Sequence, residues 1–226
     1  MAWNWNVIRE AWPVVLEGAR MTLFLSAMGI LFGTVVGMLV GVLRSHKQTN
    51  PVLRVLASLS TVYVEVMRGT PFLVQLYLVY YGAPLFFGIN IPEIPAGIAA
   101  ISLNSGAYVA EIFRAGIQSV DKGQMEAGRS LGLNYQQTMW HIILPQAVKR
   151  ALPPLGNEFI TLIKESSIVS VIGIQEMSFK GRIVGSSNYA PFEPMLVVAV
   201  VYLIMTWVTG RLVLALERRL KTGDQH

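Results

Sequence analysis

The chain contains no cysteine and only three histidines, which excludes several kinds of chemical site at once. Without cysteine there is no disulfide framework, no thiolate nucleophile and no cysteine-ligated zinc or iron–sulfur centre. The histidines, His46, His141 and His226, are far apart in the sequence and show no metal-ligand spacing. We therefore expect neither a metal site nor redox chemistry based on thiols.

Charge is also scarce. Only 14% of the 226 residues are charged and 53% are hydrophobic, with a mean hydropathy of +0.51. A soluble domain usually carries about 25% charged residues. A membrane-spanning helix needs about 20 mostly apolar residues, so the chain has room for several spans and little else. The composition predicts an all-α integral membrane protein.

Hydropathy predicts five transmembrane helices. They are Met21–Leu43, a second span from near Val52 to Pro92, Ile94–Ala110, Ala147–Ile174 and Pro194–Leu216. The first span carries glycines at positions 29, 33, 37 and 41, a stripe of small residues that allows another helix to approach closely. We divide the chain into an amphipathic N-terminal segment (1–18), a transmembrane domain (19–216) and a cytoplasmic tail (217–226).

Basic residues orient these spans. With the N-terminus outside and the C-terminus cytoplasmic, the positive-inside rule is satisfied, because most Lys and Arg then fall in cytoplasmic segments. The cytoplasmic basic residues are Arg44, Lys47, Arg54, Arg114, Lys122, Arg129, Lys149, Arg150, Arg211, Arg218, Arg219 and Lys221. The net charge of +5 is explained in this way, and no nucleic-acid partner is expected. Trp3, Trp5 and Trp12 are expected to anchor the N-terminal segment to membrane lipid at the interface.

The loop between the third and fourth spans is patterned. GQMEAGRSLG predicts a short helix that ends before Gly132, where glycine adopts a left-handed backbone most easily. Asn134 is a good N-cap for a second helix, with Gln137 three residues later. This second helix would place Met139, Ile142 and Ile143 on one side. Two short helices form a firm cytoplasmic projection, and an amphipathic surface loop is the alternative interpretation.

The spacing Glu126-Ala127-Gly128, Gly132, Ile142-x-Leu144-Pro145 resembles the EAA signature of permease subunits in bacterial ABC importers. RGTPFLVQL at 68–76 and NSGAYVAEIFRAGI at 104–117 resemble the branch that imports histidine, glutamine, arginine and glutamate. The resemblance covers residues 18–216. The chain departs from the signature at Gly128, where the third position is usually alanine.

The resemblance implies the type I ABC importer permease fold in a bacterial plasma (inner) membrane. Its signature loop, with Glu126, Ala127, Gly128, Gly132, Ile142, Leu144 and Pro145, would dock on a cytoplasmic ATP-binding-cassette ATPase subunit. An extracytoplasmic amino-acid-binding protein would deliver the solute. The chain itself contains no GxxxxGK[ST] motif for ATP and no catalytic motif, so we expect no enzyme activity, no catalytic residues and no cofactor, with ATP bound by the partner subunit.

Polar residues within the predicted spans are candidates for solute contact, since ionisable groups in lipid are costly and usually functional. Asn104, Tyr108 and Glu111 share one face of the third span. In the fourth span, Glu165, Ser166, Ser167 and Ser170 offer a carboxylate and hydroxyls to a zwitterion, and the resemblance also identifies this stretch as cavity lining. Hydrogen bonds between helices are the alternative role for the serines, and a pair with Arg114 is the alternative for Glu111.

Arg68-Gly69-Thr70-Pro71 predicts a break in the second span. Thr70 can cap a new helical segment that Pro71 begins, and Glu65 can pair with Arg68 one turn later. Attraction of an anion to the free N–H groups at this break is the second interpretation, after a structural clamp.

We therefore expect the permease subunit of an ATP-driven importer of polar L-amino acids. Five spans are few for enclosing a water-lined path, so a second permease copy or a paralogue should complete it as a dimer. The alternatives are a membrane scaffold that recruits a cytoplasmic protein and an ion-coupled secondary transporter, which would normally carry paired repeats and more spans.

Overall fold

The computed structural model describes residues 4–45 and 50–222, and within these residues every regular element is a helix. Lys47, His46, His226 and Trp3 lie outside the described residues. The helices are α1 (Trp5–Ser45), α2 (Pro51–Gly69), α3 (Phe72–Phe87), α4 (Glu93–Gln118), α5 (Lys122–Ser130), α6 (Tyr135–Thr138), the π-helix η1 (Met139–Ile143), α7 (Leu144–Glu165), the 3₁₀-helix η2 (Ser166–Ile172), α8 (Met177–Ser187) and α9 (Phe192–Thr222). This all-α architecture confirms the predicted fold class.

Three helices are long and apolar enough to cross a membrane: residues 5–44 of α1, the whole of α4 and residues 192–220 of α9. The pair α2 and α3, bent by 113° at the break between them, also qualifies when taken as one span. The remaining predicted span, the fourth, corresponds to α7 and η2. α7 carries five charged residues. Among the described helices, it is not one that length and composition identify as a membrane span.

The glycine stripe of α1 packs against α4, as its four-residue spacing predicts. A Cβ atom at Gly33 would lie 2.9 Å from Ser105 Cβ, and one at Gly37 would lie 2.8 Å from the backbone oxygen of Gly106. Farther along the helix, a Cβ atom at Gly41 would lie 3.0 Å from the Ala110 backbone oxygen. α1 and α4 therefore touch backbone to backbone along this seam, which a larger side chain would open.

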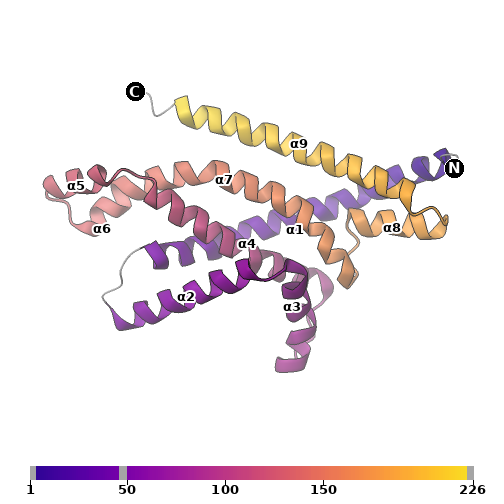
Figure 1. Cartoon of the computed structure of the whole chain (residues 1–226), viewed down its shortest axis with the longest axis horizontal. Helices are drawn as coiled ribbons and strands as arrows, with labels where there is room; N and C mark the ends of the chain where they lie inside the picture. Colours follow the sequence, from indigo (N-terminus) through magenta and orange to yellow (C-terminus); the bar gives the residue numbers. More distant parts are fainter. Residues whose placement is uncertain (1–3, 46–49, 223–226) are drawn as a thin grey trace.

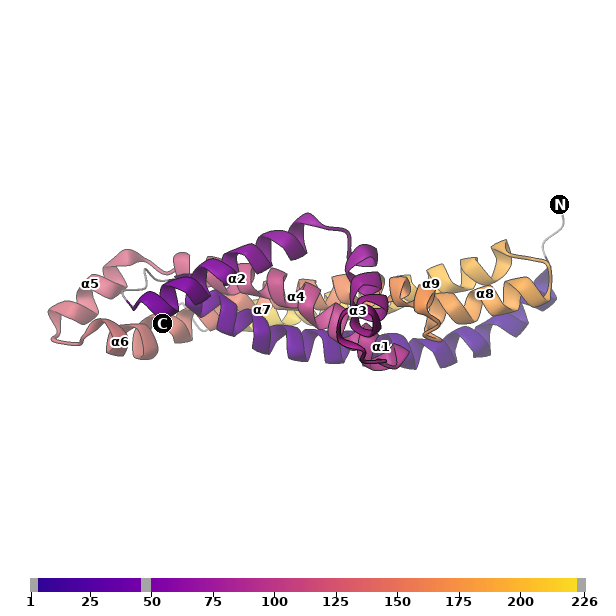
Figure 2. The same cartoon turned by 90° about the horizontal axis from the view of Figure 1, so that it is seen from below.

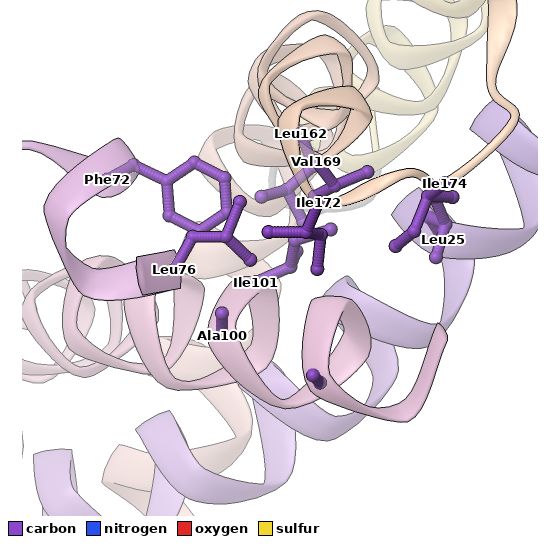
Figure 3. Packing of buried hydrophobic residues seen from close by; sticks show 10 residues of the cluster. Leu25, Phe72, Leu76, Ala100, Ile101, Leu162, Val169, Ile172 and Ile174 are labelled. Atoms are coloured by element: carbon purple, nitrogen blue, oxygen red, sulfur yellow. The ribbon is translucent and has the colours of Figure 1, made fainter. Parts of the chain in front are cut away.

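A hydrophobic core lies where α1, α3, α4, α7 and η2 meet (Figure 3). Leu25 of α1, Leu76 of α3, Ile101 of α4 and Leu162 of α7 are almost completely buried there. The core holds the start of α3 against the bundle, whereas the far end of α3 projects away from it (Figure 1). The exposed Phe86 and Phe87 at that end are suited to lipid or to another protein chain.

The two ends of the molecule carry different elements. In Figures 1 and 2, α5 and α6 lie at one end, and α8 lies at the opposite end beside the start of α1. The amphipathic segment expected at 1–18 is helical from Trp5 and continues into the first span without a break. The tail expected at 217–226 begins inside α9, and residues 223–226 lie outside the described residues.

The fourth predicted span changes helix type at its serines. α7 ends at Glu165, and residues 166–172 continue as a 3₁₀-helix up to Gly173, whose φ is +94°. The hydroxyls of Ser166, Ser167 and Ser170 each donate to a carbonyl three residues earlier, at 2.6–2.7 Å. Bonds at this spacing compete with the α-helical pattern and suit the tighter helix.

A buried acid at the opposite end of the bundle was missed by the sequence reasoning. Glu176, fully buried, is the N-cap of α8 and accepts hydrogen bonds from the Ser178 and Phe179 amides at 2.9 and 2.8 Å. The Tyr202 hydroxyl of α9 donates to the same carboxylate at 2.8 Å. Glu176 therefore joins α8 to α9, a structural role that depends on a long-range contact.

Candidate functional site

The loop at one end of the bundle consists of two helices with defined ends. The α5 helix stops at Ser130, and Gly132 follows with φ +87°, donating its N–H to the Arg129 carbonyl at 3.0 Å. Asn134 and Gln137 form the predicted capping box, with both hydrogen bonds at 2.9 Å. These local features agree with the sequence pattern because neighbours in the chain determine them.

The second helix of this loop is not a separate element. α6, η1 and α7 follow one another without a gap, so the loop is continuous with the helix that carries Glu158 and Glu165. Ile142 and Met139 pack beside buried Ile143 against Met125 of α5, as their predicted shared face requires. A displacement of the loop would therefore reach α7 directly.

Gly128 explains the chain's departure from the EAA signature. It is buried against α6, and a Cβ atom there would lie 2.6 Å from Cγ2 of Thr138. An alanine would therefore require Thr138 to move. This movement is costly, because β-branched threonine has little freedom at χ1. The glycine is thus matched to Thr138 in this chain.

The outer surface of the loop is apolar at two points. Leu131 is 81% exposed and Trp140 is 67% exposed, while Glu126, Ala127 and Pro145 are also exposed. Leu144 and Ile142 are partly buried. Partial burial raises the pKa of the Tyr135 phenol above its usual value. An exposed tryptophan and leucine on a rigid two-helix projection are typical of a protein-docking surface.

The break in the second span lies between Gly69 and Phe72, within the predicted Arg68–Pro71 segment. The predicted cap is wrong, however. Pro71 occupies the N-cap position of α3, and the Thr70 hydroxyl donates backward to the Val66 carbonyl at 2.8 Å. Threonine here terminates α2 instead of starting α3.

Gln75 holds the bend, and sequence reasoning missed it. Its amide nitrogen donates to the backbone carbonyls of Met67 and Thr70 at 2.7 and 3.1 Å. Asn104 of α4, 3% exposed, donates to the Gln75 amide oxygen at 2.8 Å. Asn104, expected to contact solute, therefore contributes a hydrogen bond between helices in this structure.

An ionic cluster surrounds Glu111 of α4. Arg44 near the end of α1 donates to one carboxylate oxygen, and Arg114 donates to the other at 2.7 Å. Arg68 lies farther from the second oxygen, at 3.8 Å, with its guanidinium 5.6 Å from the centre of the Tyr108 ring. Arg68 thus faces Glu111, whereas the sequence predicted a pair with Glu65, and the alternative pair of Glu111 with Arg114 is present.

A cavity of about 500 Å³ adjoins this cluster, between α2, α4 and α7. Its lining includes Arg68, Tyr108, Arg114, Arg150 and Glu158. At the loop end of the cavity, Arg150 of α7 donates to the backbone oxygen of Ser119, two residues before the N-cap of α5. The cavity therefore contains charges of both signs and ends beside the loop.

The other predicted solute contacts lie away from this cavity. Ser166 and Ser170 are buried, and the hydroxyls of all three predicted serines are engaged within η2 or its preceding turn. Glu165 is partly buried and has no ion pair among the described residues. Within those same residues no group of three or more His, Asp or Glu side chains could hold a metal ion.

Comparison with known proteins identifies the family. Residues 33–222 match the model of the binding-protein-dependent transport system inner membrane component. The chain is 40% identical to the glutamine transport system permease protein of Escherichia coli K12 over 222 residues, 98% of this chain and 99% of the relative. It is 38% identical to a probable amino-acid permease of Bacillus subtilis over 205 residues, 90% of this chain and 89% of the relative.

Solved structures of ABC transporters also match this chain. A crystal structure of an amino acid ABC transporter with histidines contains a chain that matches with a TM-score of 0.89 and 42% identity, covering 97% of this chain and 100% of that one. The methionine transporter MetNI, at 20% identity and a TM-score of 0.70, shares the fold and covers 90% of this chain and 96% of its own. The chain belongs to the family of inner-membrane permease components of binding-protein-dependent ABC transport systems.

Proposed function

We propose that the chain is the translocation subunit of an importer for polar L-amino acids. The observation that carries this proposal is the match, over nearly the full chain, to relatives described as glutamine or amino-acid permeases. The half-buried polar groups on α4 and α7 support it, because a membrane scaffold gains nothing from costly charges within its spans.

ATP hydrolysis belongs to a separate cytoplasmic subunit in this proposal. The chain lacks the phosphate-binding GxxxxGK[ST] motif, and α5, with the exposed Leu131 and Trp140, forms the surface on which that ATPase docks. A binding protein outside the membrane delivers the amino acid, and a second permease copy or a paralogue completes the path. The chain itself holds no cofactor.

We orient the N-terminus outside and the C-terminus in the cytoplasm. The loop end of the bundle carries Arg54, Lys122 and Arg129, and the basic end of α9 extends toward the same side (Figure 1). An excess of Lys and Arg on one side is typical of the cytoplasmic face.

Uptake by reconstituted vesicles tests the function. The chain, its ATPase subunit and its binding protein are placed in liposomes with ATP trapped inside, and uptake of labelled glutamine, histidine, arginine and glutamate is measured. We expect uptake only with internal ATP and external binding protein, and no change when ionophores collapse ion gradients. Uptake that needs an ion gradient instead of ATP would indicate a secondary transporter, and no uptake of any amino acid would favour the scaffold.

Glu165 remains our candidate for contact with a cationic substrate group, and Tyr108, which lines the cavity between α2, α4 and α7, remains a separate candidate. Glu165→Gln keeps the shape and removes the charge, so affinity for basic amino acids should fall by roughly tenfold to a hundredfold or more, from about 1.5–3 kcal/mol for a charge-assisted contact. Glu10→Gln, at an exposed position of α1, is the matched control. A loss of thermal stability in Glu165→Gln, with normal uptake by the folded fraction, would identify a structural residue.

A further inference from the structure

The outward side of α9 is apolar over the length of a membrane span. Only 22% of the most apolar part of this helix is buried in the bundle. Leu196, Leu203 and Ile204 are exposed on its outward side. These side chains are bulky, whereas surfaces on which membrane helices pack together are enriched in small residues, as in the glycine stripe of α1. The outward side of α9 is therefore suited to lipid chains and not to another helix.

The charged residues of α9 place its apolar part in the bilayer. Arg211 is the first charged residue after Glu193, eighteen positions earlier, which corresponds to about 27 Å along a helix. The hydrocarbon core of a bilayer is about 30 Å thick. In Figure 1, α9 runs from the end of the molecule beside α8 toward the end that carries α5. Arg211 therefore lies where the hydrocarbon meets the lipid headgroups, on the side of the membrane that faces the loop.

Trp207 and Arg211 form a pair one helical turn apart at this level. Trp207 is 63% exposed, and the Arg211 guanidinium lies 5.9 Å from the centre of its ring. Within the described part of the chain, no carboxylate lies within 4.0 Å of the exposed Arg211 side chain. Arginine can stack on an aromatic ring and still donate along its edge to phosphate oxygens. The pair thus has the donor pattern of a phosphate site.

Further basic charge follows the pair on α9. Arg218, Arg219 and Lys221 outnumber Glu217 in the last turns of the helix. Basic residues beside an anionic membrane surface each strengthen the attraction to it. A zwitterionic lipid also carries a phosphate, but its ammonium group would be repelled by these cations. The charge of this end of α9 therefore favours a headgroup with a net negative charge.

We propose that Trp207 and Arg211 bind the headgroup of an anionic phospholipid in the leaflet on the loop side of the membrane. Arg211 donates hydrogen bonds to the phosphate, and the Trp207 ring lies at headgroup depth, where tryptophan is enriched in membrane proteins. The acyl chains lie along Leu203 and Ile204. This site goes beyond the proposed function, because it concerns the membrane and not the transported solute.

A lipid held at this site would also support α7. Val213, two residues after Arg211, packs against α7 so closely that a Cβ atom at Gly156 would lie 2.5 Å from Val213 Cγ2. A headgroup that fixes Arg211 therefore fixes a segment of α9 in direct contact with α7. Because a ligand that binds the folded state raises its melting temperature, the lipid should stabilise the protein against thermal unfolding.

Lipid titration of the full chain tests the proposal. The chain is purified in detergent with the subunits that accompany it, and native mass spectrometry counts bound phosphatidylglycerol and, as the neutral comparison, phosphatidylcholine. The wild type should bind phosphatidylglycerol at least tenfold more tightly, a ratio of roughly the size expected for two basic residues at an anionic surface. Arg211→Gln should weaken phosphatidylglycerol binding by roughly fivefold to tenfold and leave phosphatidylcholine binding unchanged. Arg129→Gln, which removes the same charge from α5 at the far end of the bundle (Figure 1), should bind both lipids as the wild type does.

Two further variants separate the geometry of the pair from its charge. Arg211→Lys keeps the charge but not the stacked, forked guanidinium, so its affinity for phosphatidylglycerol should be intermediate. Trp207→Leu keeps an apolar side chain and removes the ring, so it should weaken binding by roughly twofold to fivefold. Phosphatidylglycerol should raise the melting temperature of the wild type and of Arg129→Gln by more than that of Arg211→Gln.

Three results would overturn the site. Wild-type affinity in Arg211→Gln, or an equal loss in Arg211→Gln and Arg129→Gln, would show that the pair does not recognise the lipid. Displacement of phosphatidylglycerol by excess inorganic phosphate would identify a site for free anions instead. A change in the number of chains in the particle when Trp207 is replaced would show that protein covers this side of α9. Amino-acid uptake is not measured in this experiment, so a failure of the proposed function would leave its outcome unaffected.

Discussion

The two sides of α4 differ in what they contact. One side packs against the glycine stripe of α1 so closely that Gly37 and Gly106 meet backbone to backbone. The other side carries Tyr108, Glu111 and Ala115 into the mixed-charge cavity beside α7. The comparison shows how a membrane helix can hold several charges in position, because a tight apolar seam on one side fixes the polar side opposite.

The seam should be the most sensitive part of this arrangement. In Gly37→Ala the new methyl group would lie 2.8 Å from the Gly106 backbone oxygen, which cannot move without shifting α4. We expect destabilisation of about 3 kcal/mol, at the upper end for overpacking. Thermal unfolding in detergent measures it. Gly210→Ala is the matched control, because its nearest neighbour, Ile160 Cδ1, is 3.9 Å away, and equal melting temperatures would contradict the close seam.

Replacing Gln75 removes the side chain that links the α2–α3 bend to α4. Gln75→Leu leaves the Met67 and Thr70 carbonyls and the Asn104 amide without this partner. An unsatisfied buried polar group costs about 1–3 kcal/mol, so we expect a loss of about 2 kcal/mol in the same melting assay. Asn104→Ala should lose less, since only one of these bonds involves it. A larger effect of Asn104→Ala on uptake than on stability would instead restore its predicted role in solute contact.

In the loop beyond α4, the turn at Gly132 should be sensitive to substitution because of its backbone conformation. At φ +87° a side chain at position 132 is strained, and Gly132→Ala should destabilise the turn by about 1–2 kcal/mol. Association with the ATPase subunit, measured by copurification and titration, should weaken by roughly fivefold to thirtyfold. Gly132→Asn is the control, because asparagine tolerates the left-handed region better. Unchanged association in Gly132→Ala would show that the turn does not position the docking surface.

Replacing the serines of η2 should have the smallest effect on stability and uptake. The Ser170 hydroxyl donates to the Ser167 carbonyl in its own helix, so Ser170→Ala removes no contact between elements. We expect changes below about 0.5 kcal/mol in stability and no change in uptake. A tenfold fall in uptake with normal melting would mean that the hydroxyl turns toward the substrate during transport.

Local features were predictable from the sequence because neighbouring residues determine them. The left-handed Gly132, the Asn134 capping box and the glycine stripe all follow from short spacings. The roles of Gln75 and Arg44 were not predictable, because each depends on which side chains from other helices meet it. Polarity within a span pointed to α4 and α7, which line the cavity, whereas the side chains of Asn104 and the serines make hydrogen bonds within the protein.

The central claim, that α4 has one sealed side and one side open to the path, can be tested by labelling. The chain has no cysteine, so a single introduced cysteine is its only thiol. Ala115 is exposed in the cavity, and Ala110 on the same helix is fully buried against Gly41. In the assembled complex, a charged, membrane-impermeant thiol reagent should modify Ala115→Cys rapidly, and glutamine should slow the reaction, while Ala110→Cys should stay unmodified. Equal labelling of the two cysteines, or labelling of Ala115→Cys that glutamine leaves unchanged, would contradict the account.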